Sequence, residues 1–268
     1  MNGLLAEIGK KLADRWLSAL LLPGLLFTSV VLCGWWLGHA HALDPARLQA
    51  YAQRLGQQLN GRPAAVLLAV MGALLCATAT GLAVQALAAV VRRSWAAASP
   101  TWWVALRRRR VEEALLRRGH TVPERYLPAR VTTIGDRFRL VGERIDAQYG
   151  LFVTLAWPRL WLLLPEPVTT TVRDATTRYR VAAETAAWGT LYLLLGIVWW
   201  PAALVGVVTL VTGYVRGRSS AAVLADLVEA AVDTHQRMLA DSLGVELPNG
   251  RITPAEGARI NDMLNKRA

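Results

Sequence analysis

Three long apolar runs dominate the pattern of hydrophobic and polar positions along this chain. They cover residues 17–38, 64–91 and 186–215, and none contains Asp, Glu, Lys, Arg or His. About 18 consecutive uncharged apolar residues suffice for a helix that crosses a membrane. The pattern therefore predicts an integral membrane protein that is mainly all-α, with the first two spans at 17–38 and 64–91.

The third run is too long for one ordinary span. As a single helix it would extend about 45 Å at 1.5 Å per residue, well beyond a hydrocarbon core of about 30 Å. A Trp-Trp-Pro sequence at 199–201 lies near its middle. Proline disrupts a helix interior but suits a helix start, and paired Trp favour the membrane–water interface. We predict a tight hairpin of two spans, 182–200 and 201–217; one tilted helix with an external C-terminus is the alternative.

Residues 1–16 precede the first span and are predicted to form an amphipathic interfacial helix. Leu4, Leu5, Ile8, Leu12 and Trp16 share one stripe of that helix, away from its charged positions. The basic start and an A-x-A sequence at 40–42 imitate a signal peptide. The apolar run is longer than the usual ~7–15 residues of a signal core, so we expect an uncleaved span.

The charge distribution predicts how the chain is threaded. The net charge is +11, and 17 of the 30 Lys and Arg lie between Arg92 and Arg180. Cytoplasmic loops carry an excess of Lys and Arg. With both termini inside, all but the three arginines of the 39–63 segment are cytoplasmic. The bias toward Arg and Ala is typical of a GC-rich bacterium, so we expect a multi-pass protein of the bacterial plasma membrane.

Residues 39–63 are predicted to lie outside the cell and to contain a short helix at 43–60. Asp44 is its predicted N-cap, and Pro45 occupies its first turn. A narrow apolar stripe would rest on the spans, formed by Leu48, Tyr51, Leu55 and Leu59.

Residues 92–181 are predicted to form a basic cytoplasmic domain. A helix at 101–118, ended by Gly119, carries a Trp pair followed by an Arg run. This combination is typical of an anchor against anionic lipid of the inner leaflet, and a cytoplasmic acidic protein is the second candidate partner. Nucleic acid is an unlikely partner, because no nucleic-acid-binding signature accompanies the arginines. The predicted lipid- or partner-binding residues are Trp102, Trp103, Arg107, Arg108, Arg109, Arg110, Arg117 and Arg118.

The rest of this domain is predicted to be mostly helical. A helix at 136–148 would have Asp136 as its N-cap. The apolar stretch 151–164 is too short to span comfortably; a buried strand, an interfacial helix and a re-entrant segment are all compatible with it. A helix at 168–184 would run into the third span.

Residues 218–268 are predicted to form cytoplasmic helices. Helical periodicity continues from the fourth span to about residue 243, which implies a helix of about 60 Å. Its predicted buried face comprises Leu224, Val228, Ala231, His235, Met238 and Ser242. A last helix begins with a capping box in which Thr253 is the N-cap, Pro254 is N1 and Glu256 is N3.

The sequence offers little catalytic chemistry. It contains no GxSxG, HExxH, P-loop or GxGxxG motif, so we expect no enzyme, no cofactor and no metal site. The three apolar runs carry no Asp, Glu, Lys, Arg or His, which argues against ion-coupled transport. They do carry polar residues that suit helix packing or a pore lining: Thr78, Thr80, Gln85, Thr190, Thr209 and Thr212.

Four stretches resemble an uncharacterised family of actinobacterial integral membrane proteins. They read IGKKLADRWLSALLLPG (8–24), TTIGDRFRLVGERIDAQYGLFVTLAWPRLWLLLPE (132–166), WWPAALVGVVTLVTGYVRGRS (199–219) and ADLVEAAVDTH (225–235). The resemblance covers most of the chain. It implies the four-span layout and transfers no catalytic residue.

The leading functional hypothesis is a non-enzymatic, oligomeric membrane protein whose cytoplasmic domain receives a signal or partner at the inner leaflet, such as the membrane effector of a stress or defence system. A passive channel or regulated pore is the alternative. A lipid-directed enzyme is a third hypothesis and would require Arg159, Glu184 and His235 to converge.

Overall fold

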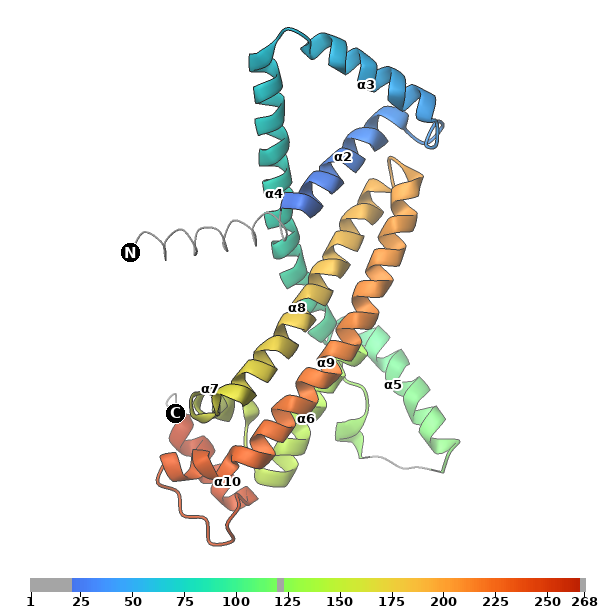
Figure 1. Cartoon of the computed structure of the whole chain (residues 1–268). Helices are drawn as coiled ribbons and strands as arrows, with labels where there is room; N and C mark the ends of the chain where they lie inside the picture. Colours follow the sequence, from blue (N-terminus) through green and yellow to red (C-terminus); the bar gives the residue numbers. More distant parts are fainter. Residues whose placement is uncertain (1–20, 120–122, 266–268) are drawn as a thin grey trace, which may run out of the picture. The chain divides into compact units, whose positions relative to one another are not determined.

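The computed structural model describes residues 21–119 and 123–265, and this part of the chain contains helices but no strand, which confirms the all-α prediction (Figure 1). The predicted amphipathic helix at 1–16 and the start of the first span lie outside the described residues. The helices are α2 (Leu22–Leu37), α3 (Pro45–Leu59), α4 (Pro63–Ala96), α5 (Thr101–Leu116), η2 (Glu124–Tyr126), α6 (Thr133–Tyr149), α7 (Val153–Leu163), α8 (Glu166–Leu195), α9 (Trp200–Ser242) and α10 (Pro254–Leu264).

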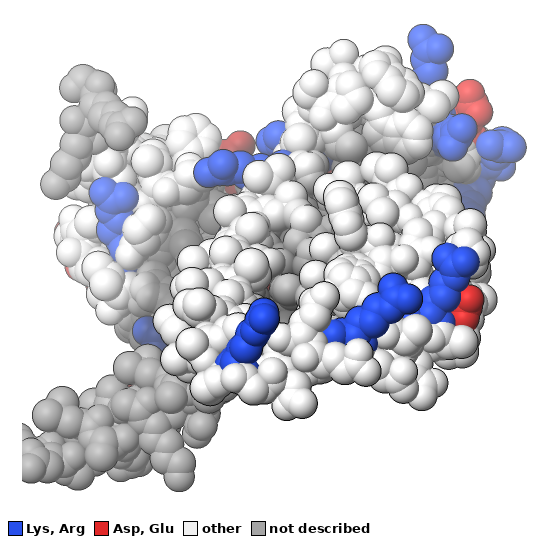
Figure 2. All heavy atoms as spheres, turned by 90° about the horizontal axis from the view of Figure 1, so that it is seen from above, with Lys and Arg blue, Asp and Glu red and all other residues white. Residues whose placement is uncertain are grey.

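The chain divides into two compact units. The apolar unit comprises the described residues up to Val91 together with Ala183–Tyr214, and the basic unit comprises Arg92–Ala182 and the residues from Val215 onward. Helices α4, α8 and α9 contribute residues to both. Figure 2 shows one face of the chain, on which uncharged residues predominate and most charged side chains are basic.

Within the described residues, α4 is the one helix long and apolar enough to cross a membrane, and only 11% of its most apolar window is buried. Helix α2 is also apolar but has 16 residues. The third apolar run, 186–215, is divided between the end of α8 and the start of α9.

The break between these two helices lies at 196–199, because α8 ends at Leu195 and α9 begins at Trp200. A continuous helix through 186–215 is therefore wrong, and the turn precedes the predicted position by a few residues. Pro201 is the second residue of α9, where its missing N–H leaves no intrahelical hydrogen bond unmade.

Small residues let α8 and α9 approach closely within the apolar unit. A Cβ built on Gly189 would lie 2.5 Å from the backbone N of Leu210, and one on Gly206 would lie 2.5 Å from the backbone N of Leu193. We call this contact, together with Gly213 against Ala186, the glycine seam.

Three of the threonines predicted to pack helices or line a pore form hydrogen bonds within their own helix and not across helices. The hydroxyls of Thr78, Thr80 and Thr190 each donate to the carbonyl oxygen four residues earlier in their own helix, at 2.8–3.0 Å. The close approach of α8 to α9 in this unit therefore depends on the glycines of the seam. Gln85 is exposed and Thr209 and Thr212 are half-buried.

Helix α3 begins as the sequence predicts. The Asp44 carboxylate accepts hydrogen bonds from the backbone N–H groups of Ala46 and Arg47, and Pro45 occupies the first turn. No residue of α3 is buried, although the rings of Trp36 and Tyr51 are in contact.

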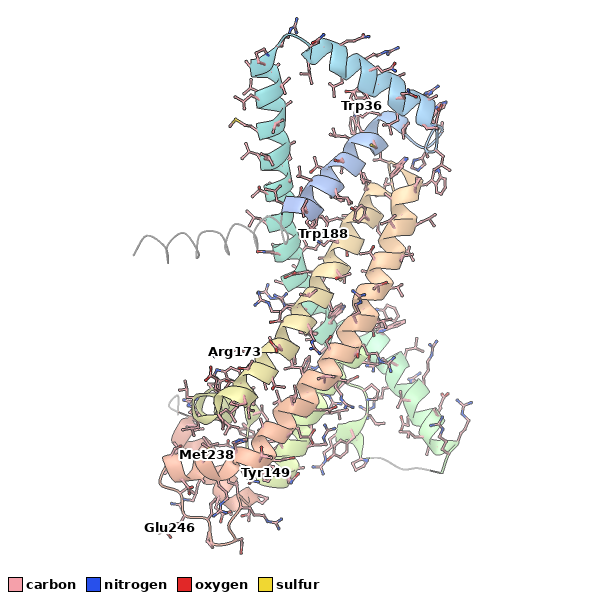
Figure 3. The ribbon with its side chains drawn as sticks, viewed as in Figure 1. Trp36, Tyr149, Arg173, Trp188, Met238 and Glu246 are labelled. Carbon is pink, nitrogen blue, oxygen red and sulfur yellow. The ribbon has the colours of Figure 1, made fainter. Side chains whose placement is uncertain are left out.

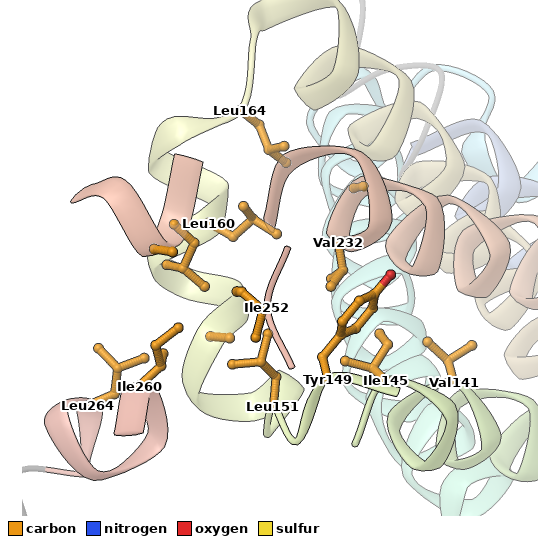
Figure 4. Close-up of a cluster of buried hydrophobic side chains, with 14 of the residues drawn as sticks. Val141, Ile145, Tyr149, Leu151, Leu160, Leu164, Val232, Ile252, Ile260 and Leu264 are labelled. Atoms are coloured by element: carbon orange, nitrogen blue, oxygen red, sulfur yellow. The ribbon is translucent and has the colours of Figure 1, made fainter. Parts of the chain in front are cut away.

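The core of the basic unit joins α6, α7, α9 and α10 (Figure 4). Helix α7 contributes Ala156 and Leu160, and it is a helix despite Pro158 in its interior. The strand alternative for 151–164 is therefore wrong, and the stretch is a helix in the core of the basic unit. Of the predicted face of α9, Ala231 is buried and Leu224, Val228 and His235 are half-buried, but Met238 (Figure 3) and Ser242 are exposed. Because Val232 and Leu239 are buried instead, the prediction is correct for part of this face and wrong toward the end of the helix.

Helix α10 is docked by polar contacts as well as by its apolar face. The Asn261 side chain accepts a hydrogen bond from the Phe152 N–H at 3.0 Å and donates to the Gly150 carbonyl at 2.7 Å. A Cβ on Gly257 would overlap the Tyr149 carbonyl, so only glycine permits this approach.

The capping box of α10 is confirmed. The Glu256 carboxylate accepts hydrogen bonds from the hydroxyl and the N–H of Thr253, which lower the pKa of Glu256.

Acidification is expected to loosen the start of α10. A carboxylate whose pKa is lowered by folding stabilises the folded state above its ordinary pKa, and this contribution disappears as the pH falls through the lowered value. Hydrogen-exchange protection of the first turn, corrected for intrinsic exchange, should therefore fall below about pH 4.5. The Glu256→Gln variant should lack this component, and an identical pH profile for the two proteins would contradict the assignment.

Candidate functional site

The predicted Trp pair lies at the start of α5, a helix with no buried residue. Trp102 is 66% exposed and Trp103 is 41% exposed, and their rings meet edge to face with centroids 5.8 Å apart. The indole N–H of Trp103 donates to the Val131 carbonyl at 3.3 Å. Trp102 is therefore presented outward, while Trp103 also holds α5 against the following loop.

The first arginine of the run, Arg107, serves the interior of the basic unit. It forms an ion pair with Asp136, which is only 5% exposed, and donates to the carbonyl of Arg130 at 2.7 Å. Asp136 also accepts the N–H groups of Ala129 and Arg130 at 2.8 and 3.0 Å, and Arg139 lies 3.5 Å away. Arg107 is thus committed to this cluster and is not offered to a ligand.

Asp136 is not the N-cap of its helix, which corrects the sequence prediction. Helix α6 begins at Thr133, and the hydroxyl of Thr132 accepts the N–H of Gly135. Asp136 therefore lies inside the first turn. Its carboxylate points to the preceding loop and to α5.

The remaining arginines of α5 divide into paired and unpaired groups. Arg108 pairs with Glu124 at 2.6 Å, and this hydrogen bond lowers the pKa of Glu124. Arg117 donates to the Glu113 carbonyl. Three exposed arginines have no hydrogen-bond or ion-pair partner within residues 21–119 and 123–265: Arg109, Arg110 and Arg118.

Six further arginines flank the apolar segments of α4, α8 and α9. They were not among the predicted site residues, although pairs of Arg beside each apolar run are a visible signal. We call them the basic collar: Arg92, Arg93, Arg178, Arg180, Arg216 and Arg218.

Trp95 joins the three helices beside the collar. Its ring fills the space next to Gly217, where a Cβ would approach within 2.7 Å, and it lies 5.9 Å from the ring of Tyr179. Burial raises the pKa of Tyr179, and the charge of Arg92 partly opposes that shift. Trp95 therefore brings the collar segments of α4, α8 and α9 together at one junction within the basic unit.

Polar pairs hold α6 to α9. Arg137 pairs with Asp226 at 2.7 Å, Arg144 pairs with Glu229, and the Tyr149 hydroxyl donates to Asp233 at 2.9 Å. The hydrogen bond from Arg144 to Glu229 raises the pKa of Arg144. The pKa of Tyr149 is raised mainly by burial and, to a smaller extent, by its hydrogen bond to Asp233.

Two of the three residues that a lipid-directed enzyme would require form hydrogen-bond contacts with neighbours in their own helix. Arg159 donates to the Leu155 carbonyl, and the His235 ring lies 2.7 Å from the Thr234 hydroxyl. Both belong to the basic unit, whereas Glu184 belongs to the apolar unit. Within the described part of the chain, no group of three or more His, Cys, Asp or Glu side chains could hold a metal ion.

The chain matches no family model, and no curated protein or solved structure matches it.

Proposed function

We propose that this chain is a non-enzymatic integral membrane protein with four spans, at 17–38, 64–91, 182–200 and 201–217. Both termini are cytoplasmic, and the basic unit receives an anionic partner at the inner leaflet of a bacterial plasma membrane. The family resemblance noted above supports the same layout.

The observation that carries the proposal is the exposed apolar surface of α4. A core helix of a soluble protein is mostly buried, yet side chains such as Leu67, Leu68 and Leu75 are exposed over a helix that carries no charge between residues 64 and 91. Apolar surface of this extent requires lipid or another protein. Lipid covers it in our proposal, and a second copy of the chain covers part of it in the predicted homo-oligomer.

The separation of charge between the two units supports the proposed orientation. Five charged residues occur in the described part of the apolar unit, namely Asp44, Arg47, Arg54, Arg62 and Glu184. The basic collar lies beside the apolar segments in the sequence, as expected for the cytoplasmic ends of spans. Each such charge near an anionic leaflet contributes about 1 kcal/mol.

No observation favours the alternative of a pore. Three of its predicted lining hydroxyls, those of Thr78, Thr80 and Thr190, already donate to their own helices. We therefore propose one function.

Cysteine labelling in cells should reveal the proposed threading. Cys33 and Cys76 are first replaced by Ala. Single Gln57→Cys and Glu246→Cys variants are then made at exposed positions on α3 and in the loop after α9, where Figure 3 labels Glu246. A membrane-impermeant maleimide should label the Gln57→Cys variant in intact spheroplasts. It should label the Glu246→Cys variant only after permeabilisation.

Two results would overturn the proposed topology. Labelling of the Glu246→Cys variant in intact spheroplasts would place the C-terminal part outside. Recovery of the protein in the soluble fraction after lysis, with both variants labelled equally, would remove the membrane assignment altogether.

A further inference from the structure

A cavity of about 750 Å³ lies among α6, α7, α8 and α9 of the basic unit. Its apolar wall includes Phe138, Trp157, Trp161 and Leu224, and its charged residues are Arg173 and Arg180. Sites for small ligands usually enclose about 300–1,000 Å³ and combine apolar walls with a few polar groups. We call this cavity the Trp–Arg groove.

The two arginines of the groove share one face of α8. They are seven residues apart, which is about two helical turns or roughly 10.5 Å. The Arg173 guanidinium lies 5.6 Å from the centre of the Trp161 ring, where it gains a cation–π contact. Neither Arg173 nor Arg180 forms an ion pair with any described residue, and both are exposed. Figure 3 labels Arg173 on α8.

The tryptophans of the groove supply apolar area and further donors. Trp157 and Trp161 lie one turn apart on α7, with ring centroids 5.8 Å apart. Neither indole N–H has an acceptor in the described part of the chain. Because the groove contains donors and two cations but no Asp or Glu, its chemistry fits a ligand that is both anionic and apolar.

The position of the groove along the chain indicates where such a ligand would come from. In the proposed topology the third span begins at residue 182, and Arg180 lies about 3 Å before it along α8. The headgroup layer is about 5–8 Å thick on each side of the hydrocarbon, so Arg180 lies at its depth.

We propose that the Trp–Arg groove binds an anionic phospholipid of the inner leaflet. The phosphate lies against Arg180 at the depth of the headgroup layer, and the polar headgroup extends along α8 toward Arg173 and its neighbour Trp161, about 13 Å before the start of the span. This inference rests on the proposed function, because it requires α8 to enter the membrane near residue 182. It places the principal lipid contact on α7 and α8 instead of on α5.

Native mass spectrometry of the full chain, delipidated in detergent and titrated with phosphatidylglycerol, tests the groove. The Arg173→Glu/Arg180→Glu variant should bind the first phosphatidylglycerol at least 10-fold more weakly. The matched control is Arg109→Glu/Arg110→Glu, which makes the same charge change at two unpaired arginines of α5 and should bind as the parent does. Equal weakening of both variants would show a diffuse charge effect and overturn the proposal.

A second variant and a second ligand identify the chemistry. The Arg173→Lys/Arg180→Lys variant keeps the charge and should retain most of the binding, which guards against loss of binding through misfolding. The Trp157→Ala/Trp161→Ala variant should weaken phosphatidylglycerol binding as well. Displacement of the lipid by millimolar glycerol phosphate would instead indicate a site for a small soluble anion, and would overturn the lipid assignment.

The maleimide experiment above separates this inference from the proposed function. If the topology is as proposed but the Arg173→Glu/Arg180→Glu variant binds phosphatidylglycerol normally, the groove inference alone fails. If the chain does not cross the membrane, the proposed function fails first.

Discussion

Replacing Asp136 with Ala is expected to lower the free energy of unfolding of the basic unit by about 3–5 kcal/mol. The substitution leaves Arg107 without its ion-pair partner in a largely buried position and removes the acceptor for the N–H groups of Ala129 and Arg130. Removal of one member of a buried ion pair is costly because the other charge stays desolvated. Urea unfolding of the detergent-solubilised protein, followed by circular dichroism, measures the change.

The matched control is Asp226→Ala. Asp226 also pairs with an arginine, Arg137, but both side chains are exposed. An exposed pair contributes about 0–1 kcal/mol, so this variant should unfold nearly as the parent does. If the two variants lose equal stability, the Asp136 cluster is not the buried anchor that its contacts indicate.

Replacing Gly206 with Leu is the second large expected effect. The new side chain would meet the backbone of Leu193, which cannot rotate away, so α8 and α9 would have to separate along the glycine seam. Overpacking typically costs about 1–3 kcal/mol and occasionally more, and contact with backbone places this variant at about 3 kcal/mol. Thermal unfolding in detergent micelles gives the difference in stability.

Gly72→Leu provides the control for that change. Gly72 lies within α4, and a Cβ there would meet no atom within 4 Å. The substitution adds the same apolar volume and replaces a poor helix former with a good one. It should be neutral or slightly stabilising, and a loss similar to that of Gly206→Leu would argue against the seam.

The elements that follow from local chemistry could be predicted from the sequence. Asp44 with Pro45, and Thr253 with Glu256, act through neighbours within four positions, so their helix starts were correct. The hairpin break could also be anticipated from the Pro at 201. The start of α6 could not be placed from a Gly-Asp pair, because Thr132 supplies the cap and Asp136 is bound to an arginine 29 residues away.

The candidate site shows the same limit. Consecutive arginines on a helix point in directions about 100° apart, so a run of four cannot all face one partner. Only the position of the loop around residue 130 determines that Arg107 turns inward while Arg109 and Arg110 stay exposed. The fold of 151–164 depends in the same way on distant residues, because Leu160 packs in a cluster with Leu239 and Ile260.

Helix α10 also determines when the basic unit can finish folding during synthesis. Ile260 and Leu264 belong to the same buried cluster as Tyr149, and Asn261 bonds to both sides of the turn after it. At about 5–20 residues per second, a ribosome needs roughly 6–23 s to proceed from Tyr149 to Leu264. Until α10 is complete, the surfaces of α6 and α7 that it covers in the folded protein lack this contact. We therefore expect part of this apolar surface to stay uncovered in the nascent chain until its last helix emerges.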